Sequence, residues 1–208
     1  MFKSSVAVGK LVEDLRNEVD IALPIPNHTY LEWLNSLEQL LYSEIIQEQK
    51  EYILKNPENT DIAYASMAVE GDRVRFEDIV AVFVNDVQLI KSSVLSGQIF
   101  PNCYYKKDED NLGLNVYIQP EDTIEKIRVI YRPRPKLKEV KGDNETISAD
   151  DYVMLPEEFV ELARAKLRGE AYKLANEDLL AAKWLNEYNV MLENFRVWIA
   201  EKQSTFGL

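Results

Sequence analysis

The chain has 208 residues, of which 46% are hydrophobic and 29% are charged, and this composition excludes a largely disordered chain. The net charge of −12 argues against tight binding of duplex DNA, because such binding needs Lys and Arg to displace counterions from the phosphates. Cys103 is the only cysteine, so no disulfide forms within the chain. No stretch approaches the roughly 18 apolar residues of a membrane span, and the first residues lack the apolar core of a signal peptide. We therefore expect a soluble protein that is made in the cytoplasm.

Helical periodicity governs the N-terminal part of the chain. Apolar side chains at helical spacing predict a short amphipathic helix over about 5–20. The prolines of LPIPN interrupt this pattern, and Asn27 or Thr29 is placed to cap a second helix over about 29–54. Glu38 and other acidic residues fall off the apolar face of the second helix, so we expect them to be exposed to solvent.

Strand signals fill the middle of the chain. Runs of alternating apolar residues, separated by turn sequences, predict a mostly antiparallel β domain. Two of these runs, CYYKK (103–107) and LNVYI (114–118), flank the sequence DEDNLG and predict a hairpin. A further turn is predicted at Asn85 and Asp86, because both residue types tolerate turn conformations.

The sequence TIEKIRVIYRPRPKL (123–137) predicts the last strand and its end. Pro133 and Pro135 lack the N–H group that strand pairing needs, so pairing should stop there or continue only at a sheet edge. Arg132 and Arg134 belong to the densest basic cluster of the chain. Because the chain as a whole is acidic, we expect these arginines to make ion pairs with the helices or with a partner protein rather than with nucleic acid.

A polar loop over 138–154 leads into the sequence LPEEF, which indicates the start of a helix. Two helices are predicted, over about 156–174 and 177–202, with Asn176 as the N-cap of the second. The second helix has a wide apolar stripe, which suits a core on one side and another subunit on the other. The interface candidates on this stripe and on the predicted sheet are the aromatic residues Trp184, Tyr188, Phe195, Trp198, Tyr104 and Tyr105. Packing inside the fold is the alternative for each of them.

Together these elements predict an α+β fold, in which helices from both termini form a bundle and a mostly antiparallel β domain is inserted between them. The expected boundaries are 1–57 for the N-terminal helices, 58–137 for the β domain, and 138–208 for the connecting loop and the C-terminal helices.

Catalytic and cofactor-binding motifs are not recognisable in the sequence. The segment DEDNLG matches the start of a calcium-binding loop at Asp108, Asp110 and Gly113, but later ligand positions carry unsuitable residues, so a solvated turn is the better interpretation. His28 has no partner at metal-ligand spacing and is interpreted as a loop or capping residue. We therefore expect no catalytic residues, no metal and no cofactor.

In the order of its motifs, the chain resembles the head–tail connector, or adaptor, proteins of tailed bacteriophages and prophages. In that family a strand ending in a Y-x-P-x-P-like sequence precedes an L-P-E-E-F-type helix start. An alanine-rich helix, a break with an acidic residue, and a helix rich in Tyr, Asn and Glu then follow. The matching segments here are 131–135, 155–159, 171–176 and 177–195. The long β insertion is nearest in character to the members that resemble tail tubular protein A.

The resemblance implies a structural virion protein that is made in the host cytoplasm and is not an enzyme. Such a protein assembles into a ring, often twelve-fold, that binds the portal protein and joins the head to the tail proteins. DNA would pass through the ring without specific binding. Twelve copies of a chain with a charge of −12 would carry a formal charge of −144, which would repel phosphate.

Other functions stay open at this point. A different head-closure or tail-completion protein would also form rings. A cytoplasmic enzyme that uses clustered carboxylates and a metal is an alternative from a different class. A regulatory module that binds a peptide on its β domain is a further alternative function.

Overall fold

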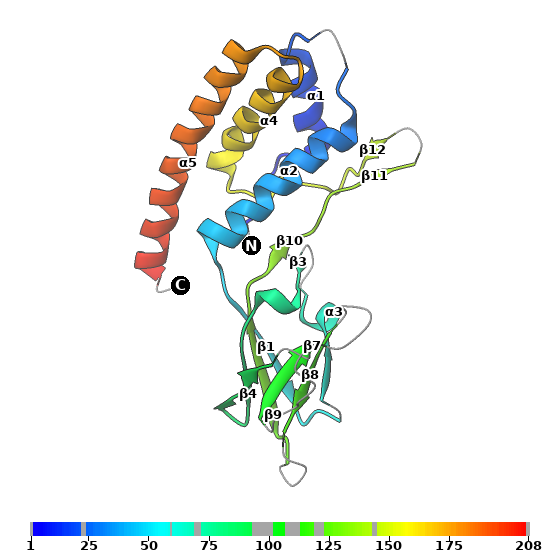
Figure 1. Cartoon of the computed structure of the whole chain (residues 1–208), viewed down its shortest axis with the longest axis vertical. Coiled ribbons are helices and arrows are strands. Elements are labelled where there is room, and N and C mark those ends of the chain that lie inside the picture. Colours follow the sequence, from blue (N-terminus) through cyan, green and yellow to red (C-terminus); the bar gives the residue numbers. More distant parts are fainter. Residues whose placement is uncertain are drawn as a thin grey trace. The chain divides into compact units, whose positions relative to one another are not determined.

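The computed structural model describes residues 2–21, 24–58, 60–68, 72–92, 102–106, 113–118, 123–142 and 145–206. The chain forms two compact units, whose elements are labelled in Figure 1. The helical unit consists of Met1–Ile46 and Leu137–Leu208, and the β unit consists of Gln47–Lys136. This organisation confirms the predicted α+β class, with helices from both termini in one unit and the β insertion in the other.

Long helices dominate the helical unit: α1 (Val8–Glu18), α2 (Asn27–Leu41), α4 (Val160–Leu174) and α5 (Asp178–Phe206). A π-helical turn, η1 (Tyr42–Ile46), extends α2, and a 3-10 turn, η4 (Glu157–Phe159), precedes α4. The connecting segment contains a short hairpin of β11 (Val140–Lys141) and β12 (Thr146–Ile147).

The close packing of α4 against α5 depends on a position without a side chain. A β-carbon at Gly169 of α4 would lie 2.7 Å from Leu185 Cδ2 of α5. Along α5 the buried residues Ala181, Tyr188 and Phe195 recur every seventh position, so one side of this helix faces the core of its unit. The two helices run side by side in Figure 1.

The β unit contains two four-stranded sheets, with the orders β1-β9-β4-β5 and β2-β8-β7-β6, and a two-stranded sheet of β10 and β3. The described pairs are antiparallel except for β6 with β7. The strands are β1 (Lys50–Lys55), β2 (Asp61–Ala63), β3 (Asp72–Arg73), β4 (Ile79–Val84), β5 (Val87–Gln88), β6 (Ile90–Lys91), β7 (Cys103–Lys106), β8 (Gly113–Tyr117), β9 (Lys126–Tyr131) and β10 (Arg134–Pro135). Two short helical segments, α3 (Tyr64–Met67) and η2 (Phe76–Asp78), complete the unit.

Strand β9 shows the alternation that its sequence predicts. Ile127, Val129 and Tyr131 are buried and the residues between them are partly exposed, because successive side chains of a strand point to opposite faces. The alternation continues through Pro133 and Pro135, which are both buried. Pairing of β9 stops at Tyr131, and β10 pairs only with β3, so the prolines end the central ladder as predicted.

Both predicted turns of the β domain connect antiparallel strands. Asn85 and Asp86 have φ angles of 48° and 66° between β4 and β5, which is the left-handed geometry of a two-residue hairpin turn. Strands β7 and β8 form the other hairpin, and 107–112, between them, lie outside the described residues.

The predicted second helix is wrong beyond Ile46. Residues Lys50–Lys55 form β1 and pair with β9 instead of continuing the helix. Gln47 has a φ angle of 47°, and no glycine or proline in the sequence indicates this change of direction. The expected boundary at residue 57 therefore lies too late in the chain, whereas the expected boundary at 137 lies within one residue of the observed one.

Smaller corrections concern chain segments whose partners are distant. The middle of the chain, which was interpreted as strands, also contains the helical segment α3 directly after the short strand β2. The strand over 123–132 is not the last one, because β10, β11 and β12 follow it.

Asn176 caps the end of α4 and not the start of α5. Its φ angle is 60°, its N–H group donates to the carbonyl of Lys173, and the N–H group of Glu177 donates to the carbonyl of Tyr172. This pair of hydrogen bonds is the Schellman motif, in which a left-handed residue satisfies the last carbonyls of a helix. The predicted break between the two helices is confirmed, but the N-cap assignment is wrong.

Substitution of Gly113 of β8 by alanine is expected to destabilise the fold. A β-carbon there would lie 2.5 Å from the backbone oxygen of Ile62, so β2 would have to move. We expect Gly113→Ala to lower the free energy of unfolding by about 1–3 kcal/mol, measured by urea denaturation. Gly9→Ala is the control, because nothing lies within 4 Å of the added carbon and alanine favours the helix, so no loss is expected. Equal stability of Gly113→Ala and the wild type would contradict the prediction.

Candidate interaction surfaces

Two aromatic interface candidates on α5 pack inside the helical unit. Phe195 is fully buried, with its ring centroid 4.8 Å from that of Phe159. Trp198 stacks on Phe195 at 6.2 Å with an interplanar angle of 17°, and it also contacts Phe2 at 5.7 Å. These contacts attach α5 to η4 and to the N-terminal segment. Phe195 and Trp198 therefore pack inside the fold, which was the alternative to an interface role.

The other two candidates on α5 contact α4. Tyr188 is buried, with the ammonium group of Lys166 5.3 Å from its ring centroid. Trp184 is half-buried, with the guanidinium carbon of Arg168 4.4 Å from its ring centroid, a geometry that favours a cation–π interaction. All four aromatic residues of the stripe therefore lie on the side of α5 that its own unit covers.

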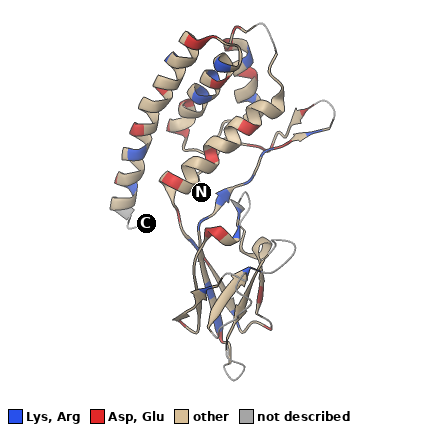
Figure 2. Ribbon diagram, in the orientation of Figure 1, with Lys and Arg blue, Asp and Glu red and all other residues tan. Residues whose placement is uncertain are grey.

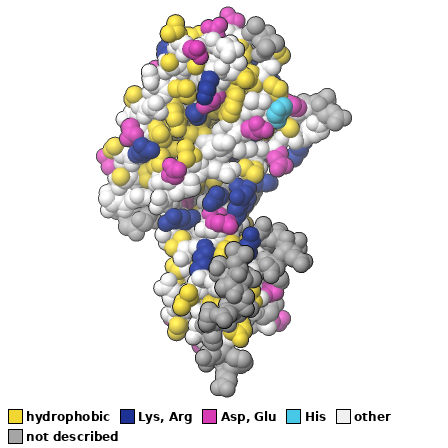
Figure 3. Space-filling view, in the orientation of Figure 1, with side chains coloured by type: hydrophobic (Ala, Val, Ile, Leu, Met, Phe, Trp, Pro, Cys, Tyr) yellow, Lys and Arg dark blue, Asp and Glu magenta, His cyan; other side chains and the backbone are white. Residues whose placement is uncertain are grey.

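The opposite side of α5 exposes large apolar side chains. Leu179, Val190 and Val197 are 89%, 63% and 59% exposed. At about 100° per residue, they lie within about 20° of one another around the helix axis, opposite Tyr188 and Phe195. We call these three residues the outer line of α5. Figure 3 shows hydrophobic side chains reaching the surface of the helical unit between polar ones. Helix α5 therefore has two apolar sides, of which its own unit covers one.

A group of arginines surrounds Asp78 in the β unit. The buried carboxylate of Asp78 accepts a hydrogen bond from Arg134 Nε at 2.6 Å and one from the backbone N–H of Arg75 at 3.1 Å. Its carbonyl accepts from the backbone N–H of Arg132 at 2.9 Å. The pairing of β10 with β3 places Arg134 opposite Arg73. We call these four arginines and Asp78 the Asp78 cluster, and basic segments of β3 and β10 are blue in Figure 2.

The Asp78 cluster has more positive than negative charge. The cluster contains four arginines and one carboxylate, and Arg73 Nε, Arg73 Nη2 and Arg132 Nε are buried without a hydrogen-bond partner among the described residues. Burial, together with the charges of Arg75 and Arg134, lowers the pKa of the Arg73 guanidinium from its usual value. Buried donors without acceptors are uncommon in folded proteins, so the described residues compensate the positive charge of the cluster only in part.

Strand alternation explains how the sequence builds this cluster. Between 126 and 136 the basic residues occupy alternate positions, which leaves the core side to apolar residues and proline. In the second segment Val74 is buried between Arg73 and Arg75. The sequence prediction included Arg132 and Arg134 but missed Arg73 and Arg75. The R-x-R spacing in 73–75 was the available signal, and its importance depended on the unpredicted pairing of β3 with β10.

Other basic residues on β9 have partners within the unit. Lys126 pairs with Asp86 at 2.9 Å, and Arg128 pairs with Glu51 at 3.2 Å while its guanidinium carbon lies 4.2 Å from the ring centroid of Phe83. Positive charge without a described ion-pair partner is therefore concentrated beyond the C-terminal end of β9, near Pro133 and Pro135.

Both tyrosine candidates lie on β7. Tyr104 is buried, with its ring centroid 5.9 Å from that of Phe76, so it belongs to the core of the β unit. Tyr105 is half-buried. Tyr104 therefore packs inside the β unit, which was the alternative to its interface role.

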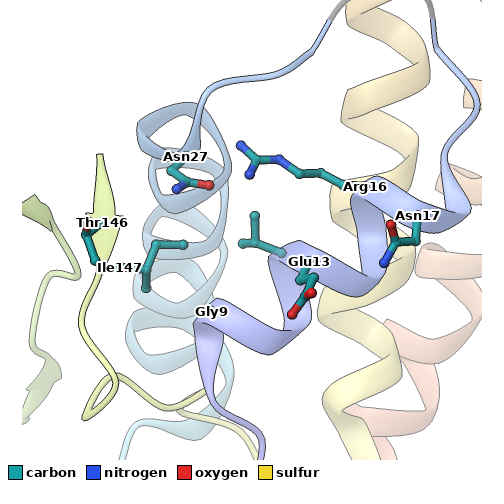
Figure 4. Close-up of a pocket in the computed structure, with 8 residues that line it drawn as sticks. Gly9, Glu13, Arg16, Asn17, Asn27, Thr146 and Ile147 are labelled. Carbon is teal, nitrogen blue, oxygen red and sulfur yellow. The ribbon is translucent and has the colours of Figure 1, made fainter. Parts of the chain in front are cut away.

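A cavity of about 400 Å³ lies in the helical unit between α1, the start of α2 and β12 (Figure 4). Figure 4 shows the side chains of Arg16 and Asn27 pointing toward one another from two helices. Arg16 donates to the carbonyl of Ile25 at 2.8 Å, and Asn27 Nδ2 donates to the carbonyl of Glu145 at 2.6 Å. Arg16 and Asn27 therefore connect the segments around this cavity, and Asn27 Oδ1 is buried without a hydrogen-bond partner among the described residues.

His28 connects the start of α2 to the turn of the β11–β12 hairpin. Its Nδ1 lies 2.5 Å from Glu145 Oε1, and the N–H group of Asn27 donates to Glu145 Oε2 at 2.8 Å. The hydrogen bond from His28 is the main reason why the pKa of Glu145 lies below its usual value. This arrangement agrees with the predicted role of His28 as a loop or capping residue.

Glu38 is not exposed to solvent, in contrast to the prediction. Its side chain is fully buried, where it pairs with the buried ammonium group of Lys138 and accepts the N–H of Met154 at 2.8 Å. Asn35 fixes the backbone of Lys138 through hydrogen bonds of 2.8 and 2.9 Å to its carbonyl and N–H groups. Burial raises the pKa of Glu38, because the loss of hydration outweighs the attraction of Lys138.

The described residues contain no group of three or more His, Cys, Asp or Glu side chains placed to hold a metal ion. Cys103 is buried on β7, while Asp108 and Asp110 lie outside the described residues. Within the described part of the chain, no helix combines the length and the apolar character needed to cross a membrane.

A comparison of the sequence with protein-family models finds no match, and a comparison with curated proteins finds none either.

Proposed function

We propose that the chain is a structural virion protein, an adaptor that forms a ring between the portal protein and the tail proteins of a bacteriophage. The motif order of the C-terminal segments supports this proposal, as does the organisation of the fold, in which helices from both termini form one unit and the β unit is inserted between them in the sequence. The proposed site of action is the virion, after synthesis in the host cytoplasm.

The outer line of α5 is the observation that carries the proposal. Helix α5 has 29 residues and is therefore about 43 Å long. Its core side is already covered, so Leu179, Val190 and Val197 are available to a neighbouring helix. Full burial of such a side chain stabilises a contact by roughly 1.5–3 kcal/mol before the costs of association. A long helix with a second apolar side suits repeated contacts between adjacent copies in a ring.

The charge of the chain fits the same function. A ring of copies that each carry −12 presents a negative potential, which favours the passage of DNA over its binding. This role needs no catalytic centre.

Co-expression with a portal protein encoded in the same genome tests the proposal. We expect one complex of ring size by size-exclusion chromatography with light scattering, and ring-shaped particles by electron microscopy. A chain that remains monomeric and never joins the portal protein would contradict the proposal. Turnover that depends on a stoichiometric metal would favour the alternative of a carboxylate enzyme.

Val190→Lys is expected to weaken this assembly at least roughly tenfold, which corresponds to about 1.4 kcal/mol. The substitution places an ammonium group in a contact between apolar side chains, where its desolvation is unfavourable. Asn189→Lys adds the same charge one position earlier, on an exposed residue outside the outer line, and should assemble like the wild type. Equal assembly of the two variants would exclude the outer line as the contact surface.

A further inference from the structure

Three arginines of the Asp78 cluster lack a counter-charge among the described residues. Arg134 pairs with Asp78, whereas Arg73, Arg75 and Arg132 make no ion pair with any residue that the structure describes. Three nitrogen atoms of Arg73 and Arg132 are buried without an acceptor. The side chains of Arg73 and Arg132 are nevertheless half-buried rather than enclosed, and that of Arg75 is exposed, so positive charge of this cluster is available to an external anion.

A carboxylate fits this arrangement. Asp78 shows how the cluster holds one, through a guanidinium N–H and a backbone N–H. The planar donor fork of arginine matches the two oxygens of a carboxylate, and such charge-assisted hydrogen bonds are stronger than neutral ones. The phosphates of duplex DNA offer similar oxygens, but a chain of net charge −12 repels an extended polyanion. A protein surface with a few carboxylates is therefore the better ligand.

We propose that the Asp78 cluster binds the carboxylates of an acidic surface on a second copy of this chain. This inference rests on the proposed ring. The helical unit contains 12 basic and 21 acidic residues, a formal charge of −9, whereas the β unit contains 12 and 15, a formal charge of −3. Charge complementarity therefore favours contact between the cluster of one copy and the helical unit of the next.

The start of α5 provides carboxylates next to the outer line. Glu177 and Asp178 are exposed, and they directly precede Leu179. An acidic contact and an apolar contact on α5 are thus continuous along one helix, so a neighbouring copy could engage both.

Sedimentation velocity of the full chain, over a range of protein and salt concentrations, tests the inference. The variant is Arg73→Ala with Arg132→Ala, because neither side chain has a charged partner whose loss would disturb the fold. We expect the dissociation constant of self-association to rise at least roughly tenfold in this variant. Raising NaCl from about 0.05 to 0.5 M should weaken the wild type more than the variant, because salt screens charge pairs.

The matched control is Lys55→Ala with Lys126→Ala. It removes two positive charges from the β unit at Cα-paired positions of β1 and β9, at the end of the ladder remote from Tyr131. This control should associate like the wild type, and the thermal unfolding of all three proteins should coincide. Equal association of the cluster variant and the wild type would overturn the inference. Association of the wild type that does not respond to salt would overturn it as well.

Two further outcomes separate this inference from the adaptor proposal. A wild-type chain that never self-associates, but joins the portal protein through a contact that Val190→Lys disrupts, would overturn the inference and support the adaptor. Binding of a short DNA duplex that the cluster variant loses, with self-association unchanged, would overturn the inference in favour of a nucleic-acid ligand.

Discussion

Replacing Lys138 with methionine is expected to lower the free energy of unfolding by about 3–5 kcal/mol near neutral pH. Methionine fills a similar volume but leaves the fully buried carboxylate of Glu38 without its cation, and among the described residues only the N–H group of Met154 still binds this carboxylate. Urea denaturation followed by circular dichroism measures the loss. The double variant Glu38→Met with Lys138→Met should recover most of it, because it buries no charge. A double variant as unstable as the single one would contradict this account.

The effect of Lys138→Met should also depend on pH. Burial raises the folded-state pKa of Glu38 above its ordinary value of 4.5. The contribution of such a group to stability is fully present below its unfolded-state pKa and is lost as pH rises through its folded-state pKa. Without Lys138 the folded-state pKa rises further, so the stability of the variant should fall more steeply than that of the wild type above about pH 5. A loss that is the same at every pH would show that Glu38 is not the cause.

Phe195→Ala is expected to lower the free energy of unfolding by about 3–5 kcal/mol. Phe195 is 0% exposed and packs against the rings of Phe159 and Trp198, so its removal leaves a cavity where α5 meets η4. Urea denaturation measures the loss, and the fluorescence of the tryptophans should report the changed surroundings of Trp198.

Val197→Ala is the matched control for Phe195→Ala. It removes apolar atoms from the same helix two positions later, but from an exposed side chain, so no cavity forms. Its effect should stay within about 0.5 kcal/mol. Similar losses in the two variants would contradict the assignment of the two sides of α5.

The helices near both ends were predictable because their signals are local. The apolar spacing of α1, the sequence LPEEF before α4, and the break at Asn176 each depend on neighbouring residues. Strand β1 was missed because its residues also continue the helical pattern of α2, and only pairing with β9, far along the chain, makes Lys50–Lys55 a strand. Local sequence does not determine which of two compatible structures has a distant partner.

The candidate surfaces likewise combine features that local sequence predicts with features that depend on distant partners. The apolar stripe of α5 was predictable from periodicity, but which side faces the core depended on the packing of α4 and η4. Arg132 and Arg134 were evident as a basic cluster, whereas Arg73 joins them only through the pairing of β3 with β10. Glu38 was assigned to solvent because acidic residues on helices usually face it. Its partner Lys138 lies 100 positions away.

The β unit begins and ends on adjacent strands. Lys50, near its start, lies opposite Tyr131, near its end, in the antiparallel ladder of β1 and β9. The helical scaffold therefore accommodates the whole insertion as it would a single hairpin. The residues of the β unit can therefore change, or the whole insertion can be exchanged, without a change in the packing of the helices.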